Sequence, residues 1–556
     1  MKNIHSALTF FRKHQLILLT ISFFLIWKFF LIALLWQGRF APPEPDDSYS
    51  YISTIASASV CQDSFLCSQY TGATVSDYSS YIQFSYRIML GSFARMFSLS
   101  PEVTYEISFY IGTILLAGTI LVFLKSFTKN TVLIGLSIFF LALYHGSGET
   151  HGFFWVVPSF FSAILFFLVA AFVINDTPHP LQYWTLPILI PLFIFMHPMS
   201  VYFLFIFLIY AVFQSILERK ISMKIINKIF IIFIIGIFSI YTQSVLMAKN
   251  GQSDPYGVKA ILPQITTTLS NIQHDTRDTI TTTPAYSIVP DQKTTPDNNI
   301  RQSYLLNRIQ TMKTAYFQWF FPHWIIIFPF ILLLYLLYRN NHYKIISLYL
   351  ATLLFFVVTT LFNQFGFRSA ILLWPLTYII YAFSLYYLFF ITIEKIPVEK
   401  SILQRIILGT LTLGLLLFII LNMLYATIVN INLNARNNYE IDKTFTDYLL
   451  KNTNPGDTIY IPRLIRQSTF GSDLFSRNKI LPPEQYPKYI LSLEPKPYQS
   501  TTINTSVRKF TNSVLSFFGR KPLSKISPVQ KKTPPEFYSL EKSFGDILIY
   551  RNTTLP

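Results

Sequence analysis

The sequence predicts an α-helical polytopic membrane protein, with about 11 transmembrane helices and a small extracytoplasmic C-terminal α/β domain. Hydrophobic residues make up 52% of the 556 positions and charged residues only 13%. Long apolar runs recur along the chain, and Lys and Arg gather in alternate connections between them. A water-soluble surface could not hide this much apolar area. The same composition excludes disordered, collagen-like and disulfide-rich secreted proteins.

Apolar runs of the length of a membrane helix predict the spans. A hydrocarbon core of about 30 Å needs roughly 20 helical residues at about 1.5 Å each. The runs that reach or approach this length are 15–36, 108–126, 131–145, 153–174, 182–197, 199–217, 228–247, 322–338, 344–362, 368–392 and 404–427. The runs beside His197-Pro198 form either two helices or one long kinked helix, so ten or eleven spans are expected.

The distribution of cations predicts the orientation, because cytoplasmic connections hold an excess of Lys and Arg. With eleven spans and a cytoplasmic N-terminus, the inner side carries Lys2, Arg12, Lys13, Lys125, Lys129, Arg219, Lys220, Lys224, Lys228, Arg339, Lys344, Lys395, Lys400 and Arg405. The short outer connections carry none, with Arg368 at the rim of the last. We therefore prefer eleven spans and predict a multi-pass protein of the plasma (inner) membrane. Because the positive charge lies between apolar spans, the net charge of +17 does not indicate a nucleic-acid partner.

Two domains follow from these runs. Residues 1–428 form the predicted transmembrane module, with a first outside loop at 37–107 and a large outside loop at 248–321. Residues 429–556 are predicted to be an extracytoplasmic α/β domain. Its expected elements are a helix at Tyr439–Lys451, a turn at Asn454–Asp457, and strands at Thr458–Ile461 and Asp546–Tyr550. No structure is assigned to the Ser-, Thr-, Pro- and Lys-rich residues 495–535.

The first span has no cleavage site after it and is predicted to stay as an anchor.

Three single residues in the N-terminal part of the chain stand out: Lys28, Cys61 and Cys67. Lys28 lies about 12 Å below its outer end, so it either touches a lipid phosphate or a carboxylate, or packs within the bundle. Cys61 and Cys67 both fall in the first outside loop. A disulfide between them is expected in an oxidising compartment, with two free thiols as the alternative.

An acidic pair follows the first span, in Pro42-Pro43-Glu44-Pro45-Asp46-Asp47-Ser48-Tyr49-Ser50-Tyr51. The prolines hold the chain extended up to Asp46, which places two adjacent carboxylates at the lipid–water boundary. Such a pair can accept a proton from a substrate hydroxyl or hold a divalent cation. It can equally cap a helix that begins there. The cofactor is therefore unknown, with a divalent cation as the candidate.

A second polar connection reads His145-Gly-Ser-Gly-Glu149-Thr-His151-Gly152. Glycines let the backbone approach a substrate or a metal closely, which makes Glu149 and His151 candidate site residues. The alternative is a Gly-rich turn without a further role, in which a histidine caps a helix end.

Cations near the outer side could bind a phosphate. The guanidinium of Arg368 presents a fixed fork of donors that suits phosphate oxygens, although Arg368 could also be an interfacial anchor. In the large loop, Arg301, Arg308 and Lys313 occur among apolar residues at helical spacing. This pattern predicts an amphipathic interfacial helix that covers the site and supplies a cation, or an ordinary surface helix. We interpret His197 as a helix-kink partner.

The layout and three motifs resemble the GT-C superfamily of membrane glycosyltransferases. Asp46-Asp47-Ser-Tyr49 is similar to the acidic motif that its members carry after the first span. Residues 367–375 resemble its late Arg followed by apolar residues and Pro, and residues 445–459 resemble the opening of its C-terminal domain. The connection around Glu149 is similar to the second acidic motif of oligosaccharyltransferase-like members, with His151 in place of the second acid.

The resemblance implies an inverting membrane glycosyltransferase. It would move a sugar from a polyprenyl-phosphate-linked donor to a hydroxyl of a glycan, lipid or protein acceptor on the extracytoplasmic face, with the lipid bilayer around it. Asp46 would be the general base, and Asp47 would position the acceptor or bind a metal. The expected substrate-binding residues are Tyr49, Glu149, His151, Arg368 and Arg308.

Other functions remain open. A polymerase or ligase of lipid-linked glycans would use cations of the large loop, here Arg301 and Arg308. A transporter or flippase for lipid-linked sugars would be expected to show inverted repeats and buried charges, of which the sequence offers only Lys28. A non-catalytic assembly protein would tolerate replacement of Asp46 and Asp47.

Overall fold

The computed structural model describes residues 2–36, 55, 84–143, 146–147, 150–151, 158–176, 180–197, 199–249, 304–313, 316, 327–362, 366–388, 439–460, 479–480, 485–493, 535–544 and 547–555, with isolated positions between 406 and 420. Its helices are α1 (Lys2–Trp36), α3 (Phe84–Met96), α4 (Pro101–Phe127), α5 (Thr131–Ala142), α6 (Pro158–Ile174), α7 (Pro180–Met196), α8 (Met199–Glu218), α9 (Met223–Lys249), α11 (Tyr304–Met312), α13 (Ile327–Arg339), α14 (Tyr343–Phe362), the 3-10 helix η4 (Gly366–Ser369), α15 (Ala370–Tyr386) and α18 (Tyr439–Asn452). Its strands are β1 (Gly146–Ser147), β2 (Thr150–His151), β3 (Thr458–Tyr460), β4 (Lys479–Ile480), β5 (Tyr489–Leu493), β6 (Tyr538–Phe544) and β7 (Ile547–Asn552).

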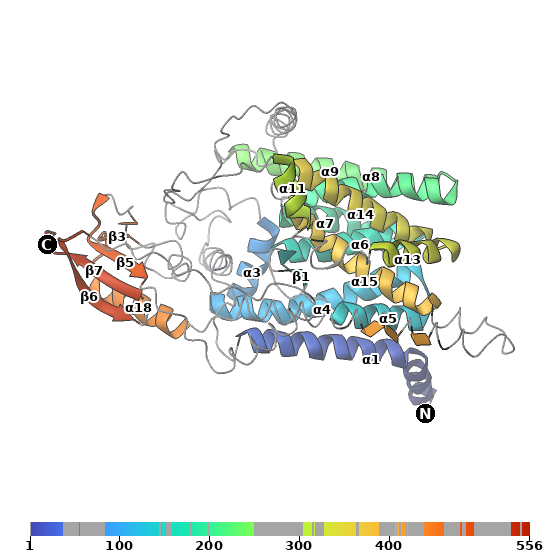
Figure 1. The fold of residues 1–556 in the computed structure, drawn as a ribbon, viewed down its shortest axis with the longest axis horizontal. Helices are drawn as coiled ribbons and strands as arrows, with labels where there is room; N and C mark the ends of the chain where they lie inside the picture. The colour runs from blue at the N-terminus through green and yellow to red at the C-terminus, as the bar shows by residue number, and fades with distance from the viewer. Residues whose placement is uncertain are drawn as a thin grey trace.

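The bundle is built from apolar helices (Figure 1). Among the described residues, five helices are long and apolar enough to cross a membrane: α1, α4, α8, α9 and α14. Apolar helices of 10–17 residues run through α5, α6, α7, α13 and α15. Each of these helices coincides with a predicted span, so the chain is a multi-pass membrane protein. The last predicted span, 404–427, lies almost wholly outside the described residues, and the count of eleven stays a prediction.

Two helix boundaries differ from the sequence-based expectation. The structure ends α7 before His197, begins α8 at Met199, and packs the two helices against each other. The alternative of one long kinked helix is therefore wrong. Helix α4 begins seven residues before its apolar run, because Ser100 caps it by accepting the Val103 N–H at 3.3 Å and Pro101 suits the first helical position.

Helix α15 lies at the centre of the bundle. All its residues from Ala370 to Leu385 are buried, and it packs against α5, α13 and α14. A helix that is apolar on every side has no preferred outward face, so it takes the most enclosed position. Pro375 interrupts its hydrogen-bond ladder, because a proline has no N–H to donate to residue 371.

One end of the bundle gathers the basic connections, and we call it the lysine end. The amide of Asn130, before α5, donates to Tyr386 Oη at the end of α15 (2.8 Å). His342, before α14, contacts the Tyr387 hydroxyl. The described cations at the helix termini and connections of this end are Lys125, Lys129, Arg219, Lys220, Lys224, Lys228, Arg339 and Lys344. These are the cations that the sequence assigns to one side of the membrane.

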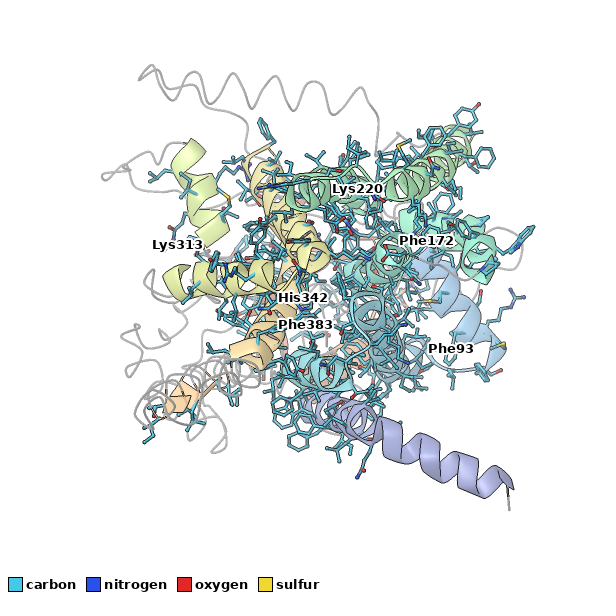
Figure 2. The ribbon with its side chains drawn as sticks, turned by 90° about the vertical axis from the view of Figure 1, so that its right-hand side faces the viewer. Phe93, Phe172, Lys220, Lys313, His342 and Phe383 are labelled. Atoms are coloured by element: carbon cyan, nitrogen blue, oxygen red, sulfur yellow. The ribbon has the colours of Figure 1, made fainter. Side chains whose placement is uncertain are left out.

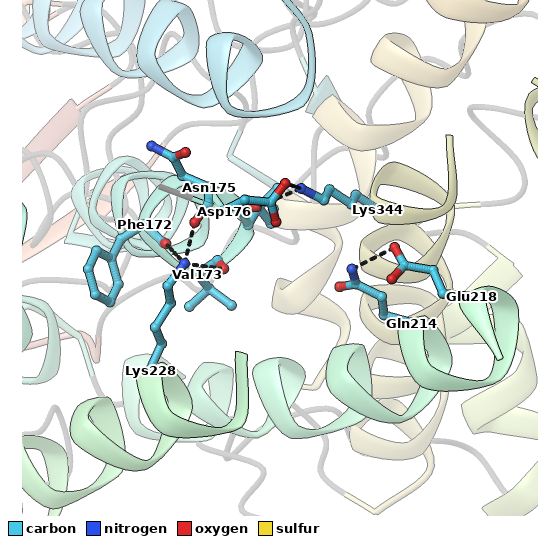
Figure 3. Close-up of polar contacts among 9 residues, drawn as sticks. Phe172, Val173, Asn175, Asp176, Gln214, Glu218, Lys228 and Lys344 are labelled. Atoms are coloured by element: carbon cyan, nitrogen blue, oxygen red, sulfur yellow. Dashed lines mark hydrogen bonds and ion pairs between the residues drawn. The ribbon is translucent and has the colours of Figure 1, made fainter. Parts of the chain in front are cut away.

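Two lysines at this end hold the terminus of α6 (Figure 3). The Lys228 ammonium group donates to the carbonyls of Phe172 (3.1 Å), Val173 (3.2 Å) and Asn175. Lys344 donates to the Ile174 carbonyl at 3.1 Å and pairs with the Asp176 carboxylate at 2.6 Å. Since the last carbonyls of a helix have no partner within it, these ammonium groups satisfy them and match the negative end of the helix dipole.

The opposite end, which we call the hairpin end, carries the β1–β2 hairpin, the α7–α8 turn and η4. There Ser200 Oγ of α8 donates to Ser162 Oγ of α6 at 2.9 Å. Helix α1 finishes at this end, because Phe23 stacks on Phe139 near the end of α5 (5.3 Å) and Phe29 meets Tyr110 in the first half of α4 (5.2 Å).

The C-terminal elements form a five-stranded sheet in the order β4-β3-β5-β7-β6. Strand β3 runs parallel to β4 and β5, whereas β7 pairs antiparallel with β5 and β6. Helix α18 is tied to the sheet by Tyr448, whose hydroxyl donates to Glu541 at 3.0 Å. The predicted helix, turn and two strands are confirmed, whereas β4, β5 and β6 were not predicted. The boundary at 428–429 lies outside the described residues and stays a prediction.

The Lys228 contact generates a stability prediction. Lys228→Met should destabilise the bundle by about 1–3 kcal/mol, because three helix-end carbonyls lose a charged donor. Thermal unfolding in detergent would measure this change. Lys224→Met, one turn earlier on the exposed side of α9, is the matched control and should leave the unfolding temperature unchanged; an equal fall in both variants would contradict the argument.

His342 generates a pH prediction. Burial lowers the pKa of His342 to about 4, from the ordinary histidine value of about 6.5, and its ring packs edge-on against Phe383 at 5.3 Å (Figure 2). The pKa of His342 is lower in the folded protein than in the unfolded chain, so the buried neutral ring contributes its full stabilisation above about pH 6.5. The free energy of unfolding should then fall by about 3 kcal/mol as the pH drops toward 4, because the unfolded chain binds the proton first. Unfolding curves of wild type and His342→Gln across this range should converge at low pH; parallel curves would refute the assignment.

Candidate functional site

Several predicted site residues lie outside the described residues. These are Asp46, Asp47, Tyr49 and Glu149, and Cys61 and Cys67 lie there as well. Their roles stay predictions. Within the described part of the chain, His, Cys, Asp and Glu form no group of three or more that could hold a metal ion. The candidate cation therefore stays a prediction too.

The hairpin that carries His151 has a defined position. Strands β1 and β2 pair antiparallel, with Gly146 opposite His151 and Ser147 opposite Thr150. Residues 148 and 149, which follow β1 in the sequence, lie outside the described residues. Strand β2 contacts α15, so the backbone of His151 lies against the central helix at the hairpin end.

His197 caps the start of α8. Its Nδ1 accepts the backbone N–H of Met199 at 3.1 Å, and its carbonyl accepts the N–H of Ser200 at 2.9 Å. Nδ1 is therefore the unprotonated nitrogen of a neutral ring. Because α7 and α8 are separate helices, His197 is the cap of α8 rather than the helix-kink partner that the sequence suggested.

Arg368 lies on η4, directly before the central helix. This short helix packs on α14, and Ser369 Oγ lies 3.4 Å from Thr359 Oγ1 near the end of α14. Arg368 is half-buried, whereas Ser369 is fully buried. The two-sided packing of η4 fixes the backbone of Arg368 at the hairpin end. A guanidinium held on a fixed backbone can bind an anion without first being ordered.

Helix α11 confirms the helix predicted in the large loop, and the structure shows which of its sides faces the bundle. Arg308 is half-buried on the same face as Met312, which packs on the core. Leu306 and Ile309 instead point outward, with 55% and 48% of their surface exposed. The helix packs against α14, whereas Lys313, which follows it, lies at the periphery (Figure 2). Arg308 is therefore on the side of the helix that faces the bundle.

Lys28 is buried within the bundle. None of its surface is exposed, and its ammonium nitrogen lies 5.8 Å from the centre of the Phe24 ring. Of the two alternatives that the sequence left open, this burial favours packing among helices over direct exposure to lipid.

The sequence reasoning missed three hydroxyl residues near α11. The structure buries Tyr316 between α14 and α15, beside Tyr349 and Thr377. No local signal distinguishes Tyr316 from the other aromatic residues of the loop, because its partners are 33 and 61 positions away.

Two arginines lie on elements that pack against the same helix, α14. Arg368 on η4 and Arg308 on α11 both belong to elements that pack on α14. A guanidinium group can stabilise a phosphate that gains negative charge. The hairpin end also receives the chain from Trp36, ten residues before Asp46 in the sequence.

Comparisons with known proteins find similarity only among solved structures. No protein-family model matches the chain, and no curated protein sequence matches it. Structures of the oligosaccharyltransferase of Archaeoglobus fulgidus, in the apo form and tethered to an acceptor peptide with the NVT sequon, match at 10% identity and a TM-score of 0.46, over 83% and 85% of this chain. The chain spans 64% of both, less than two thirds of their length.

A further structure is that of the archaeal oligosaccharyltransferase AglB from Archaeoglobus fulgidus in complex with an inhibitory peptide and a dolichol-phosphate. It matches at 11% identity and a TM-score of 0.45, over 92% of this chain and 69% of that one.

Proposed function

We propose that the chain is a membrane glycosyltransferase that moves a sugar from a polyprenyl-phosphate-linked donor to an acceptor on the extracytoplasmic face. One observation carries the proposal. Arg368 and Arg308 lie on elements that both pack on α14, and α1, the helix that precedes the Asp46-Asp47 pair in the sequence, ends at the hairpin end. Carboxylates and guanidinium groups at the same membrane boundary suit a reaction that removes a proton and stabilises a leaving phosphate.

The reaction is a single displacement with inversion. The acceptor hydroxyl attacks the anomeric carbon, its proton passes to the Asp46 carboxylate, and the bond from that carbon to the phosphate oxygen breaks. The released polyprenyl phosphate gains one negative charge, which Arg368 and Arg308 stabilise. Asp47 positions the acceptor or holds a divalent cation. Tyr49, Glu149 and His151 contact the sugar or the acceptor.

The hairpin end faces the extracytoplasmic side in this proposal. The support is that the described cations of the connections gather at the lysine end, and cytoplasmic connections hold the excess of Lys and Arg. The N-terminus and the C-terminal sheet lie at opposite ends of the molecule (Figure 1). A plasma-membrane protein with a cytoplasmic N-terminus and an extracytoplasmic C-terminal domain follows from this orientation.

Cysteine labelling tests the orientation. In a Cys61→Ser and Cys67→Ser background, Met96→Cys places a thiol on the exposed part of α3 at the hairpin end, and Lys220→Cys places one at the lysine end. A membrane-impermeant maleimide should label Met96→Cys in intact cells and Lys220→Cys only after permeabilisation. The reverse pattern would invert the proposed topology.

Two alternatives act on related substrates. A polymerase or ligase of lipid-linked glycans would also use a large-loop cation, and the inward position of Arg308 suits that reaction as well. A panel of polyprenyl-linked monosaccharides and oligosaccharides, offered with glycan, lipid and peptide acceptors, separates the two enzymes by the donor consumed. A transporter would move the same lipids across a vesicle membrane without consuming them.

Replacement of the proposed base tests the chemistry. Asp46→Asn should lower sugar transfer by about 10²- to 10⁴-fold, because it removes the proton acceptor and retains the size of the side chain. The assay follows radiolabelled sugar from the donor panel with purified protein in detergent. Asp77→Asn, in the same outside loop, is the matched control and should retain activity. Wild-type turnover by Asp46→Asn, with donor consumed, would exclude the mechanism.

A further inference from the structure

Tyr316 is enclosed by aromatic rings and hydroxyl groups of the two helices beside η4. None of its surface is exposed. Its ring meets Trp374 of α15 edge-on at 5.9 Å and lies 5.8 Å from Phe356 of α14. Its hydroxyl lies 2.6 Å from Thr377 Oγ1 and 3.1 Å from Tyr349 Oη. A side chain that follows α11 in the large loop therefore ends inside the bundle.

The three hydroxyl groups form a chain with a fixed direction. Thr377 donates its proton to the carbonyl of Leu373 at 2.8 Å. Because each hydroxyl carries one proton, Thr377 Oγ1 must accept from Tyr316, and Tyr316 must accept from Tyr349. Tyr316 is the central member and the only one of the three that lies outside α14 and α15. Loss of its hydroxyl would leave Thr377 without its donor and Tyr349 without its acceptor.

This chain fixes the side of α11 that faces the bundle. Three residues separate Met312, the last residue of α11, from Tyr316. Since residues three and four positions apart share a helix face, Arg308 lies with Thr311 and Met312 on the inner face. In this orientation the exposed Leu306 and Ile309 can face lipid while Arg308 faces the bundle. Tyr316, four residues after Met312, is buried and anchors the chain that follows the helix.

We propose that Tyr316 is a positioning residue for Arg308, and that the Tyr349–Tyr316–Thr377 chain holds α11 so that Arg308 binds the phosphate of the lipid-linked donor. The inference rests on the proposed function and deepens it, because it assigns the phosphate contact of the donor. Tyr316 acts only through Arg308 and touches neither the sugar nor the acceptor. Its removal should weaken phosphate binding and, because Arg308 also stabilises the charge that the leaving phosphate gains, lower the turnover of bound donor.

The experiment measures the binding of polyprenyl phosphate, without sugar, to the full-length protein in detergent. Tyr316→Phe removes the hydroxyl without opening a cavity and should weaken binding about tenfold, as expected for the loss of buried hydrogen bonds. Thr377→Val should weaken binding similarly, whereas Thr377→Ser, which keeps the hydroxyl, should bind as wild type does. Tyr335→Phe, at an exposed tyrosine of α13, is the matched control and should change nothing.

A double-mutant cycle separates positioning from general destabilisation. Arg308→Ala should also weaken binding about tenfold, and the double variant Tyr316→Phe with Arg308→Ala should bind no more weakly than Arg308→Ala alone. Hydrogen exchange gives a second readout: the α11 amides should exchange about tenfold faster in Tyr316→Phe, with unchanged exchange in α14 and α15. With a sugar-loaded donor, kcat/KM should fall at least about tenfold in Tyr316→Phe and in Arg308→Ala, and no further in the double variant.

The outcomes distinguish this inference from the proposed function. Additive effects in the cycle, or unchanged exchange and binding in Tyr316→Phe, would overturn the positioning role even if sugar transfer is observed. If the wild-type protein binds polyprenyl phosphate with the expected variant pattern but transfers no sugar, the proposed reaction is wrong and the phosphate site stands.

Discussion

The contact between the Lys228 ammonium group and the last carbonyls of α6 determines how the two ends of the bundle differ. A helix end inside an apolar bundle must satisfy its carbonyls, and a lysine must find partners for its charge. Lys228 and Lys344 meet both requirements at the same place, where α9 and α14 begin beside the end of α6. The cations of the described connections lie at this end of the bundle. The β1–β2 hairpin, η4 and the start of the central helix α15 lie at the opposite end.

At the hairpin end several neutral polar groups pair with one another. Ser162 with Ser200, Thr359 with Ser369, and His197 with the start of α8 pair within the bundle or cap a helix. Arg368 and Arg308 lie on elements that pack on α14. A lipid-linked phosphate is an anion that would reach this boundary from the bilayer, and guanidinium groups suit phosphate oxygens.

Helix α11 illustrates what a local pattern leaves open. The cations and apolar residues of this segment predict an amphipathic helix, and the helix is present. The pattern does not show that Tyr316 is held between α14 and α15 by hydroxyl partners that are distant in sequence. An unpaired hydroxyl within the bundle is costly, whereas the exposed Leu306 and Ile309 can face lipid.

The sequence by itself determined the membrane class, the positions of the described apolar helices and the sidedness of the cations, because hydrocarbon thickness and charge burial act on each segment independently. It also predicted α18, the following turn and the strands β3 and β7. The tertiary structure decided that α7 and α8 are separate packed helices, that α15 is central, that Lys28 is enclosed, and that Arg308 faces the bundle. The strands β5 and β6 were likewise not predicted from the sequence, because they form only by pairing with other strands of the sheet. These features depend on contacts between segments far apart in the chain, and such contacts leave no periodic trace in either segment alone.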